Sequence, residues 1–274
     1  MGGYDFGILW RAGRAVWIGQ DPYQVGGFFY PLPVAYFFAI LAALPHQMAF
    51  WVWLAFNLAL LGWMLRRRAV AWALYFPLLH LFSSGQVDLV LWALGSRLSA
   101  GWRSALAAAV ITLKPQTAFI MLPWTLWRWL REDRRTLAMW GGMTAVLWGG
   151  LLPLDPTWPL RWRAAIPSLD ASARGNAPGL WSLERHVPEA WPVLLALTAT
   201  VFVWGLFQSQ PVGWAAAALA NPSGMFYTLL ALMDTAPAWL LVPLSWIAVG
   251  LSLWWRAFTP WLIVPLAVIA YHRF

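Results

Sequence analysis

Residues 47–65 read QMAFWVWLAFNLALLGWML and are followed at once by Arg66, Arg67 and Arg68. An uncharged stretch of this length, at about 1.5 Å per residue, is close to the roughly 30 Å that a helix needs to cross a membrane. Membrane proteins retain lysine and arginine on the cytoplasmic side, so the three arginines mark an inner end. The stretch therefore predicts a membrane helix whose carboxyl end is cytoplasmic.

Apolar segments of this kind recur along the 274 residues, of which 61% are hydrophobic and 10% charged. A soluble domain averages about 45–50% apolar and about 25% charged residues, so one soluble core with an anchor does not fit. The segments do not alternate apolar and polar residues as membrane barrel strands do. We expect an all-α, polytopic helical membrane protein that forms a single integral membrane domain over residues 1–274.

The net charge of +8 comes from arginines scattered between apolar segments. This pattern disfavours nucleic acid as a partner and fits positive charge retained at a cytoplasmic face, with membrane lipids as neighbours. The chain has no cysteine, which excludes disulfides and thiolate chemistry. Its start lacks the basic and apolar regions of a cleavable signal peptide, and no internal repeat is evident.

Residues 1–45 are predicted to form a first outer loop with helices in the membrane plane. Within 6–19, Phe6, Leu9 and Trp10 share one side of a helix and Arg11 and Arg14 lie on another, which suits an interfacial position. Residues 32–44 are apolar but would extend only about 20 Å.

Membrane helices are expected over 46–152 and again over 191–274, with an outer loop at 153–190. We expect breaks at SSGQVD (83–88) and at Lys114-Pro115 to face outward, because short crossings separate them from basic clusters at 66–68 and 128–135. The full set numbers about ten or eleven membrane helices, with crossings at 47–65, 69–82, 89–98, 104–113, 117–130, 136–152, 191–207, 212–220, 224–236, 238–254 and 259–271.

This topology collects polar residues at the outer face, where ionisable groups at membrane depth usually serve substrate or structure. Lys114 is the one lysine of the chain, and structural alternatives remain open for it and its neighbours. In the structural alternative for Lys114, its ammonium snorkels to the lipid headgroups. In that for Asp88, the carboxylate forms a structural ion pair with Lys114, and in that for Asp5, the residue belongs to a frayed terminus. His46 and His80 are expected to be structural or interfacial. The outer-face set is Asp5, Asp21, Tyr23, Tyr30, Gln86, Asp88, Lys114, Gln116, Asp155, Asn176, Arg185, His186 and Tyr227.

Several of these residues stand in motifs that resemble family 87 glycosyltransferases of the GT-C superfamily. Asp5, the helix at 6–19, the Gly-x-x-Pro-Tyr turn at 19–23 and Tyr30-Pro31 resemble that family's first outer loop. SGQVDLVLWAL (84–94) resembles its Gly-Gln-x-Asn segment with Asp88 in place of Asn, and LKPQ (113–116) its Lys-Pro segment. GNAPGLWSL (175–183) and NPSGMFY (221–227) resemble two later motifs, in the family's order.

The resemblance implies a GT-C-like, inverting transfer of a sugar such as mannose from a polyprenyl-phosphate donor to a lipid or glycan acceptor. The site would face outward from a bacterial inner (cytoplasmic) membrane. Asp5 would be the catalytic base, and Lys114 with Arg11 or Arg14 would stabilise the leaving phosphate. No cofactor is firmly implied; a divalent metal at Asp5 and Asp88 is not supported by two carboxylates alone. The other substrate-binding residues would be Gln86, Asp88, Tyr23, Tyr30, Gln116, Asn176, His186 and Tyr227.

The sequence also departs from the family pattern. Family members carry a membrane helix before the Asp-bearing loop, so we expect that an upstream segment supplies it, that the helix is lost, or that a partner chain supplies it. Phe226-Tyr227 stands where mannosyltransferases of the family often carry a histidine. A non-catalytic GT-C-like subunit or scaffold is therefore a second hypothesis. A lipid or sugar transporter is a third, although it predicts pseudo-symmetric halves.

Overall fold

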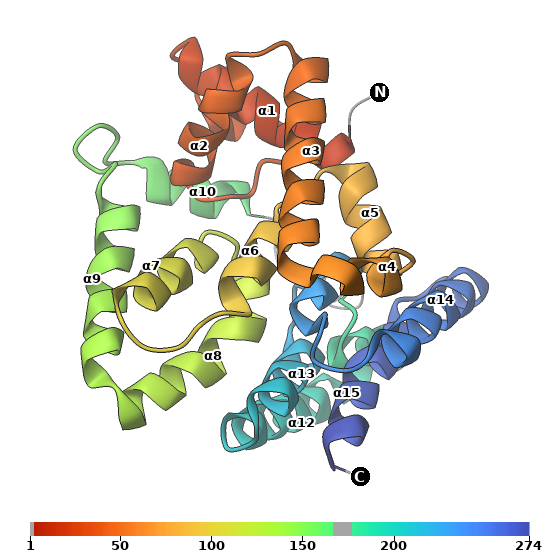
Figure 1. Ribbon diagram of the computed structural model, residues 1–274. Coiled ribbons are helices and arrows are strands. Elements are labelled where there is room, and N and C mark those ends of the chain that lie inside the picture. Colours follow the sequence, from red (N-terminus) through yellow and green to blue (C-terminus); the bar gives the residue numbers. More distant parts are fainter. Residues whose placement is uncertain (1–2, 167–176, 274) are drawn as a thin grey trace. The chain divides into compact units, whose positions relative to one another are not determined.

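The computed structural model describes residues 3–166 and 177–273, and in this part of the chain it contains helices and turns with no strand (Figure 1). The chain divides into two compact units, and each is described by itself. Unit 1 comprises residues 1–66, 80–114 and 135–167, and unit 2 comprises 67–79, 115–134 and 168–274. The all-α prediction is confirmed for the described residues, whereas the prediction of a single membrane domain stays a prediction.

Unit 1 is built around its first three helices and the short helices that follow. The loop between α1 and α2 carries Asp21, Tyr23 and Tyr30, and the turn between α5 and α6 carries Gln86. The elements that contribute to unit 1 are α1 Tyr4–Trp17, η1 Pro22–Gln24, α2 Leu32–Ala42, α3 His46–Leu65, the end of α5 Phe76–Ser84, α6 Asp88–Gly95, α7 Trp102–Ile111, nearly all of α9 Arg134–Gly149, and α10 Trp158–Ala165.

Unit 2 is built mainly from the carboxyl-terminal half of the chain, and its core lies around α13. Residues 212–220 of this helix are all buried, and Gly205 of α12 approaches Ala216 so closely that a Cβ would lie 2.6 Å from the alanine Cβ. The elements are η2 Arg66–Arg68, α4 Ala69–Trp72, the start of α5, α8 Pro115–Glu132, η3 Leu180–Arg185, η4 Pro188–Ala190, α12 Trp191–Leu206, α13 Gln210–Ala220, η5 Phe226–Leu232, α14 Ala238–Trp255, η6 Thr259–Leu262 and α15 Ile263–Arg273.

Three helical stretches of the described residues are long and apolar enough to cross a membrane: His46–Trp72, Pro188–Leu206 and Ala238–Trp255. The first contains the predicted helix at 47–65, which forms α3, so the chain has the features of a helical membrane protein. The expected total of ten or eleven membrane helices is not shown, because most other predicted crossings are shorter helices.

Two boundary predictions are wrong. The predicted crossing at 69–82 is divided between α4 and α5. The crossing predicted at 224–236 contains the seven-residue 3₁₀ helix η5, whose extent of about 14 Å is far below the membrane thickness. The described part of the outer loop predicted at 153–190 contains the short helices α10, η3 and η4, and its position outside the membrane stays a prediction.

The amphipathic helix expected at 6–19 forms as α1 and packs along α2. Phe6, Leu9 and Gly13 are buried whereas Arg11 and Arg14 are exposed, as the sequence pattern indicated. Gly13 is required by this packing, because a Cβ there would lie 2.5 Å from the backbone carbonyl carbon of Phe38 on α2. Close helix packing therefore fixes α1, and its position in the membrane plane stays a prediction.

Candidate functional site

A buried polar cluster lies in unit 1 around Lys114. The side chain of Lys114 is 4% exposed and that of Asp88 is 1% exposed. The Lys114 ammonium forms an ion pair with Asp88 and donates to Gln86 Oε1 at 3.0 Å. Lys114 thus points into the protein, so the alternative in which it snorkels to the headgroups is wrong. The ion pair with Asp88 is confirmed as a contact, and its purely structural role stays a prediction.

The ends of several helices bring these groups together. Helix α5 ends at Ser84, Gly85 adopts a left-handed backbone with φ of 76°, and Asp88 is the first residue of α6. Lys114 follows the end of α7 in a turn closed by its amide, which donates to the Ile111 carbonyl at 3.1 Å. A carboxylate in a first turn interacts favourably with the helix dipole, which helps α6 to accommodate Asp88.

Tyr30 extends this cluster from the loop between α1 and α2. Its hydroxyl donates to the same Gln86 Oε1 at 3.0 Å, and its ring centroid lies 5.9 Å from Lys114 Nζ. Burial raises the pKa of Tyr30 well above its usual value, and the charges of Asp88 and Asp5 raise it further, while the hydrogen bond with Gln86 opposes them. Tyr30 is therefore a protonated donor within electrostatic reach of both carboxylates.

Asp5 lies in the first turn of α1 and is half-buried. The start of this helix is held against the end of α5, since a Cβ on Gly3 would lie 2.3 Å from the carbonyl oxygen of Ser84. Gly85, in turn, has no room for a side chain, because its Cβ would lie 2.5 Å from the Phe6 Cβ. Asp5 thus belongs to a packed helix, which contradicts the alternative of a frayed terminus.

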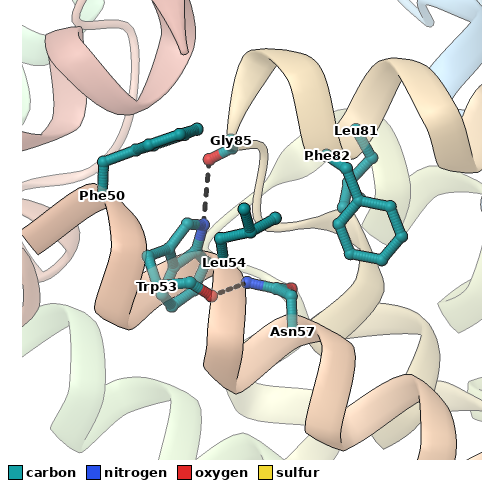
Figure 2. Close-up of a pocket in the computed structure, with 7 residues that line it drawn as sticks. All are labelled: Phe50, Trp53, Leu54, Asn57, Leu81, Phe82 and Gly85. Carbon is teal, nitrogen blue, oxygen red and sulfur yellow. Dashed lines mark hydrogen bonds between the residues drawn. The ribbon is translucent and has the colours of Figure 1, made fainter. Parts of the chain in front are cut away.

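The pocket drawn in Figure 2 is lined by residues of α3, by the end of α5 and by Gly85, the residue before Gln86. The indole of Trp53 on α3 donates to the Gly85 carbonyl at 3.1 Å, and the Asn57 amide donates to the Trp53 carbonyl at 2.8 Å (Figure 2). The pocket is too narrow for a water molecule, so we assign it no ligand. Sequence reasoning missed this support, although an asparagine in the middle of an apolar span was a signal.

A second polar cluster ties the α1–α2 loop to α10. The guanidinium of Arg161 pairs with Asp21 at 2.9 Å and with Asp155, and its carbon lies 5.8 Å from the centre of the Tyr23 ring. Burial raises the pKa of Tyr23 above its usual value, while the positive charge of Arg161 opposes this rise. The Trp162 indole also donates to the Phe29 carbonyl at 2.9 Å. The structure therefore places Tyr23 in a loop anchor, and sequence reasoning missed Arg161.

Arg11 and Arg14 lie on other sides of α1 than Asp5. At about 3.6 residues per turn, Arg14 projects from the side of α1 opposite to Asp5, and Arg11 lies about a third of a turn away. Both arginines are exposed. The prediction that they stabilise a phosphate at the Asp5 site is thus not supported, because the body of the helix lies between.

The remaining predicted site residues either belong to unit 2 or fall outside the described residues. The Gln116 carbonyl accepts from Asn221 Nδ2 at 2.8 Å, and His186 Nε2 lies 3.0 Å from Thr259 Oγ1. Tyr227 is half-buried in η5, with its ring centroid 5.8 Å from that of Phe226. Asn176 lies outside the described residues.

No group of three or more metal-ligating side chains occurs among residues 3–166 and 177–273. A metal at Asp5 and Asp88 therefore gains no further ligand from the structure. Comparison with protein-family models, with curated proteins and with solved structures finds no match to this chain. The motifs and the buried cluster around Lys114 are therefore the features from which a function can be proposed.

Proposed function

We propose that this chain is an inverting membrane glycosyltransferase of GT-C type that uses a polyprenyl-phosphate sugar as donor. In this proposal it is polytopic, with its site facing outward from a bacterial inner membrane. The observation that carries the proposal is the buried cluster in which Lys114 pairs with Asp88, while Lys114 and the Tyr30 phenol both donate to Gln86. Three of the motifs that resemble family 87, those that contain Tyr30, Gln86 with Asp88, and Lys114, thus supply neighbouring groups in unit 1.

The proposed chemistry needs one carboxylate. Asp5 takes the proton of an acceptor hydroxyl while that oxygen forms a bond to the anomeric carbon of the sugar. The bond from this carbon to the phosphate oxygen breaks, and the lipid phosphate leaves with the electron pair, so the configuration inverts. A phosphate leaves without protonation, whereas a glycosidase that expels an alkoxide generally uses two carboxyl groups.

The buried cluster suggests roles that differ from the initial assignment. Asp88 already balances the charge of Lys114, so in the structure the ammonium serves first to orient Gln86 and Asp88. The Tyr30 hydroxyl, which donates to Gln86, can still accept a hydrogen bond from a sugar hydroxyl through its oxygen. We therefore assign Lys114 to positioning, and we assign sugar binding to Gln86 and Tyr30.

The test compares Asp5→Asn with the unaltered chain in membrane vesicles supplied with radiolabelled polyprenyl-phosphate mannose and polyprenyl-phosphate glucose. We expect transfer of label from one donor by the unaltered chain and a loss of about 10²–10⁴-fold in Asp5→Asn. Glu189→Gln, which alters an exposed carboxylate of η4, is the matched control and should keep the full rate. Absence of transfer by the unaltered chain, or full transfer by Asp5→Asn, contradicts the proposal.

A non-catalytic membrane subunit is a second candidate, and one observation favours it. Asp88 stands where the resembled motif has asparagine, and it forms a buried ion pair with Lys114, which removes net charge from the cluster. A structural role for that pair needs no substrate. Purification of the chain in a fixed ratio with another membrane protein, without glycosyl transfer by the unaltered chain, would favour this candidate.

A further inference from the structure

A small basic niche lies on the side of α1 that faces away from Asp5. It lies beside Gly7, a buried residue at which an added methyl group would contact two side-chain nitrogen atoms at ordinary van der Waals distances. A Cβ at Gly7 would lie 3.6 Å from Arg11 Nη1 and 3.5 Å from His46 Nε2. Because both distances start from one point, the two nitrogens are separated by no more than their sum, 7.1 Å.

The niche is held in place by aromatic packing. The His46 ring lies 5.8 Å from the Phe6 ring and 5.3 Å from the Trp10 ring, measured between centroids. The Trp10 indole donates to the Leu44 carbonyl at 3.1 Å, which fixes α1 against the chain segment just before α3. The histidine ring is thus oriented by the protein, while Arg11 remains exposed at the mouth of the niche.

The position of His46 indicates the depth of the niche in a membrane. His46 is the first residue of α3 and of the candidate span His46–Trp72, so it marks one edge of the apolar layer. Phosphates of membrane lipids lie just outside this layer. Tyr4 and Trp17, at the two ends of α1, are 77% and 58% exposed, as expected for aromatic rings at a membrane interface.

We propose that Arg11 and His46, beside Gly7 and with Arg14 one turn further along α1, bind the phosphate of a phospholipid headgroup. Arginine presents several N–H donors to phosphate oxygens, and the imidazole can donate from Nε2. Two donors no more than 7.1 Å apart can both reach oxygens of one phosphate, because each hydrogen bond spans about 2.8 Å. The site goes beyond the proposed sugar transfer, since it lies across α1 from Asp5.

The experiment measures binding of phosphatidylglycerol to the detergent-purified chain by native mass spectrometry. Diacylglycerol, which lacks the phosphate, and inorganic phosphate, which lacks the chains, are the comparison ligands. Arg11→Gln removes one charge and should weaken phosphatidylglycerol binding about fivefold. Arg163→Gln removes an equally exposed arginine of α10 and is the matched control, with no expected change.

Gly7→Ala is a second variant that keeps every charge. Its methyl group would meet Arg11 and His46 at ordinary van der Waals distances, so α1 should remain folded while the niche is filled. We expect weaker phosphatidylglycerol binding than in the unaltered chain. The proposal is overturned if Arg11→Gln and Gly7→Ala both bind like Arg163→Gln, if diacylglycerol binds as tightly, or if inorganic phosphate alone saturates the site.

Discussion

Replacing Lys114 by methionine tests the buried ion pair most directly. Methionine keeps much of the length and apolar volume of the lysine side chain but has no ammonium, so packing changes little while the counter-charge of Asp88 is lost. The side chains of Asp88 and Lys114 are 1% and 4% exposed, so water cannot replace that counter-charge without rearrangement. Gln86 also loses a hydrogen bond of 3.0 Å to its side-chain oxygen.

Removal of one partner from a buried ion pair costs about 3–5 kcal/mol, because the other charge stays buried without compensation. We expect Lys114→Met to lower the free energy of unfolding by this amount. Replacement of both partners by apolar residues is often close to neutral. The double variant Lys114→Met with Asp88→Leu should therefore recover most of the loss, although Asp88 also serves the first turn of α6.

The assay is reversible unfolding of the purified chain in mixed micelles, followed by circular dichroism at increasing fractions of a denaturing detergent. The four proteins of the double-mutant cycle give the coupling energy between positions 88 and 114. A loss below about 1 kcal/mol for Lys114→Met is the magnitude of an exposed pair and would refute the argument from burial. Glycosyl transfer by the double variant would show that the pair is not needed for the proposed chemistry.

Two further predictions concern the loop between α1 and α2. The pKa of Tyr30 is higher in the folded chain than the value of about 10 expected in the unfolded chain. The resulting stabilisation is present below about pH 10 and is lost as pH rises from there through the folded pKa. Tyr30→Phe should flatten the decline in stability above about pH 10, measured by the same detergent titration. Arg161→Gln removes two partly exposed ion pairs and should cost about 1 kcal/mol. Cleavage of residues 18–31 by added protease should accelerate, whereas Arg163→Gln, on the same helix, should leave it unchanged.

The parts of the fold that follow from local chemistry could be predicted. An uncharged stretch before three arginines gave α3, and the amphipathic pattern of 6–19 gave α1. The break at 83–88 was expected from its polar residues, and the structure adds the reason that Gly85 must be glycine: its φ is 76° and Phe6 leaves no space for a Cβ. The two helices and the break depend on neighbouring residues, which the sequence displays directly, whereas the contact of Gly85 with Phe6 does not.

The features that escaped prediction depend on residues far apart in the sequence. Arg161 reaches Asp21 across 140 positions, and no local pattern marks an arginine in a polar segment as a partner for that turn. The 3₁₀ helix η5 replaced an expected span because hydropathy alone does not distinguish a membrane helix from a buried apolar segment. The resemblance likewise grouped Arg11 and Arg14 with Asp5 by order, whereas the rotation of α1 separates them.

The buried cluster explains why structural and functional readings of Lys114 are hard to separate by sequence. An ammonium away from water needs a carboxylate, and the carboxylate of Asp88 needs the ammonium, so each residue accounts for the other. Tyr30 and Gln86 are not accounted for in this way, because a neutral phenol and amide do not balance a charge. The part of the cluster that charge balance leaves over, and that supports a site, is therefore the Tyr30 phenol, which donates to Gln86 and stands on a loop that Arg161 anchors.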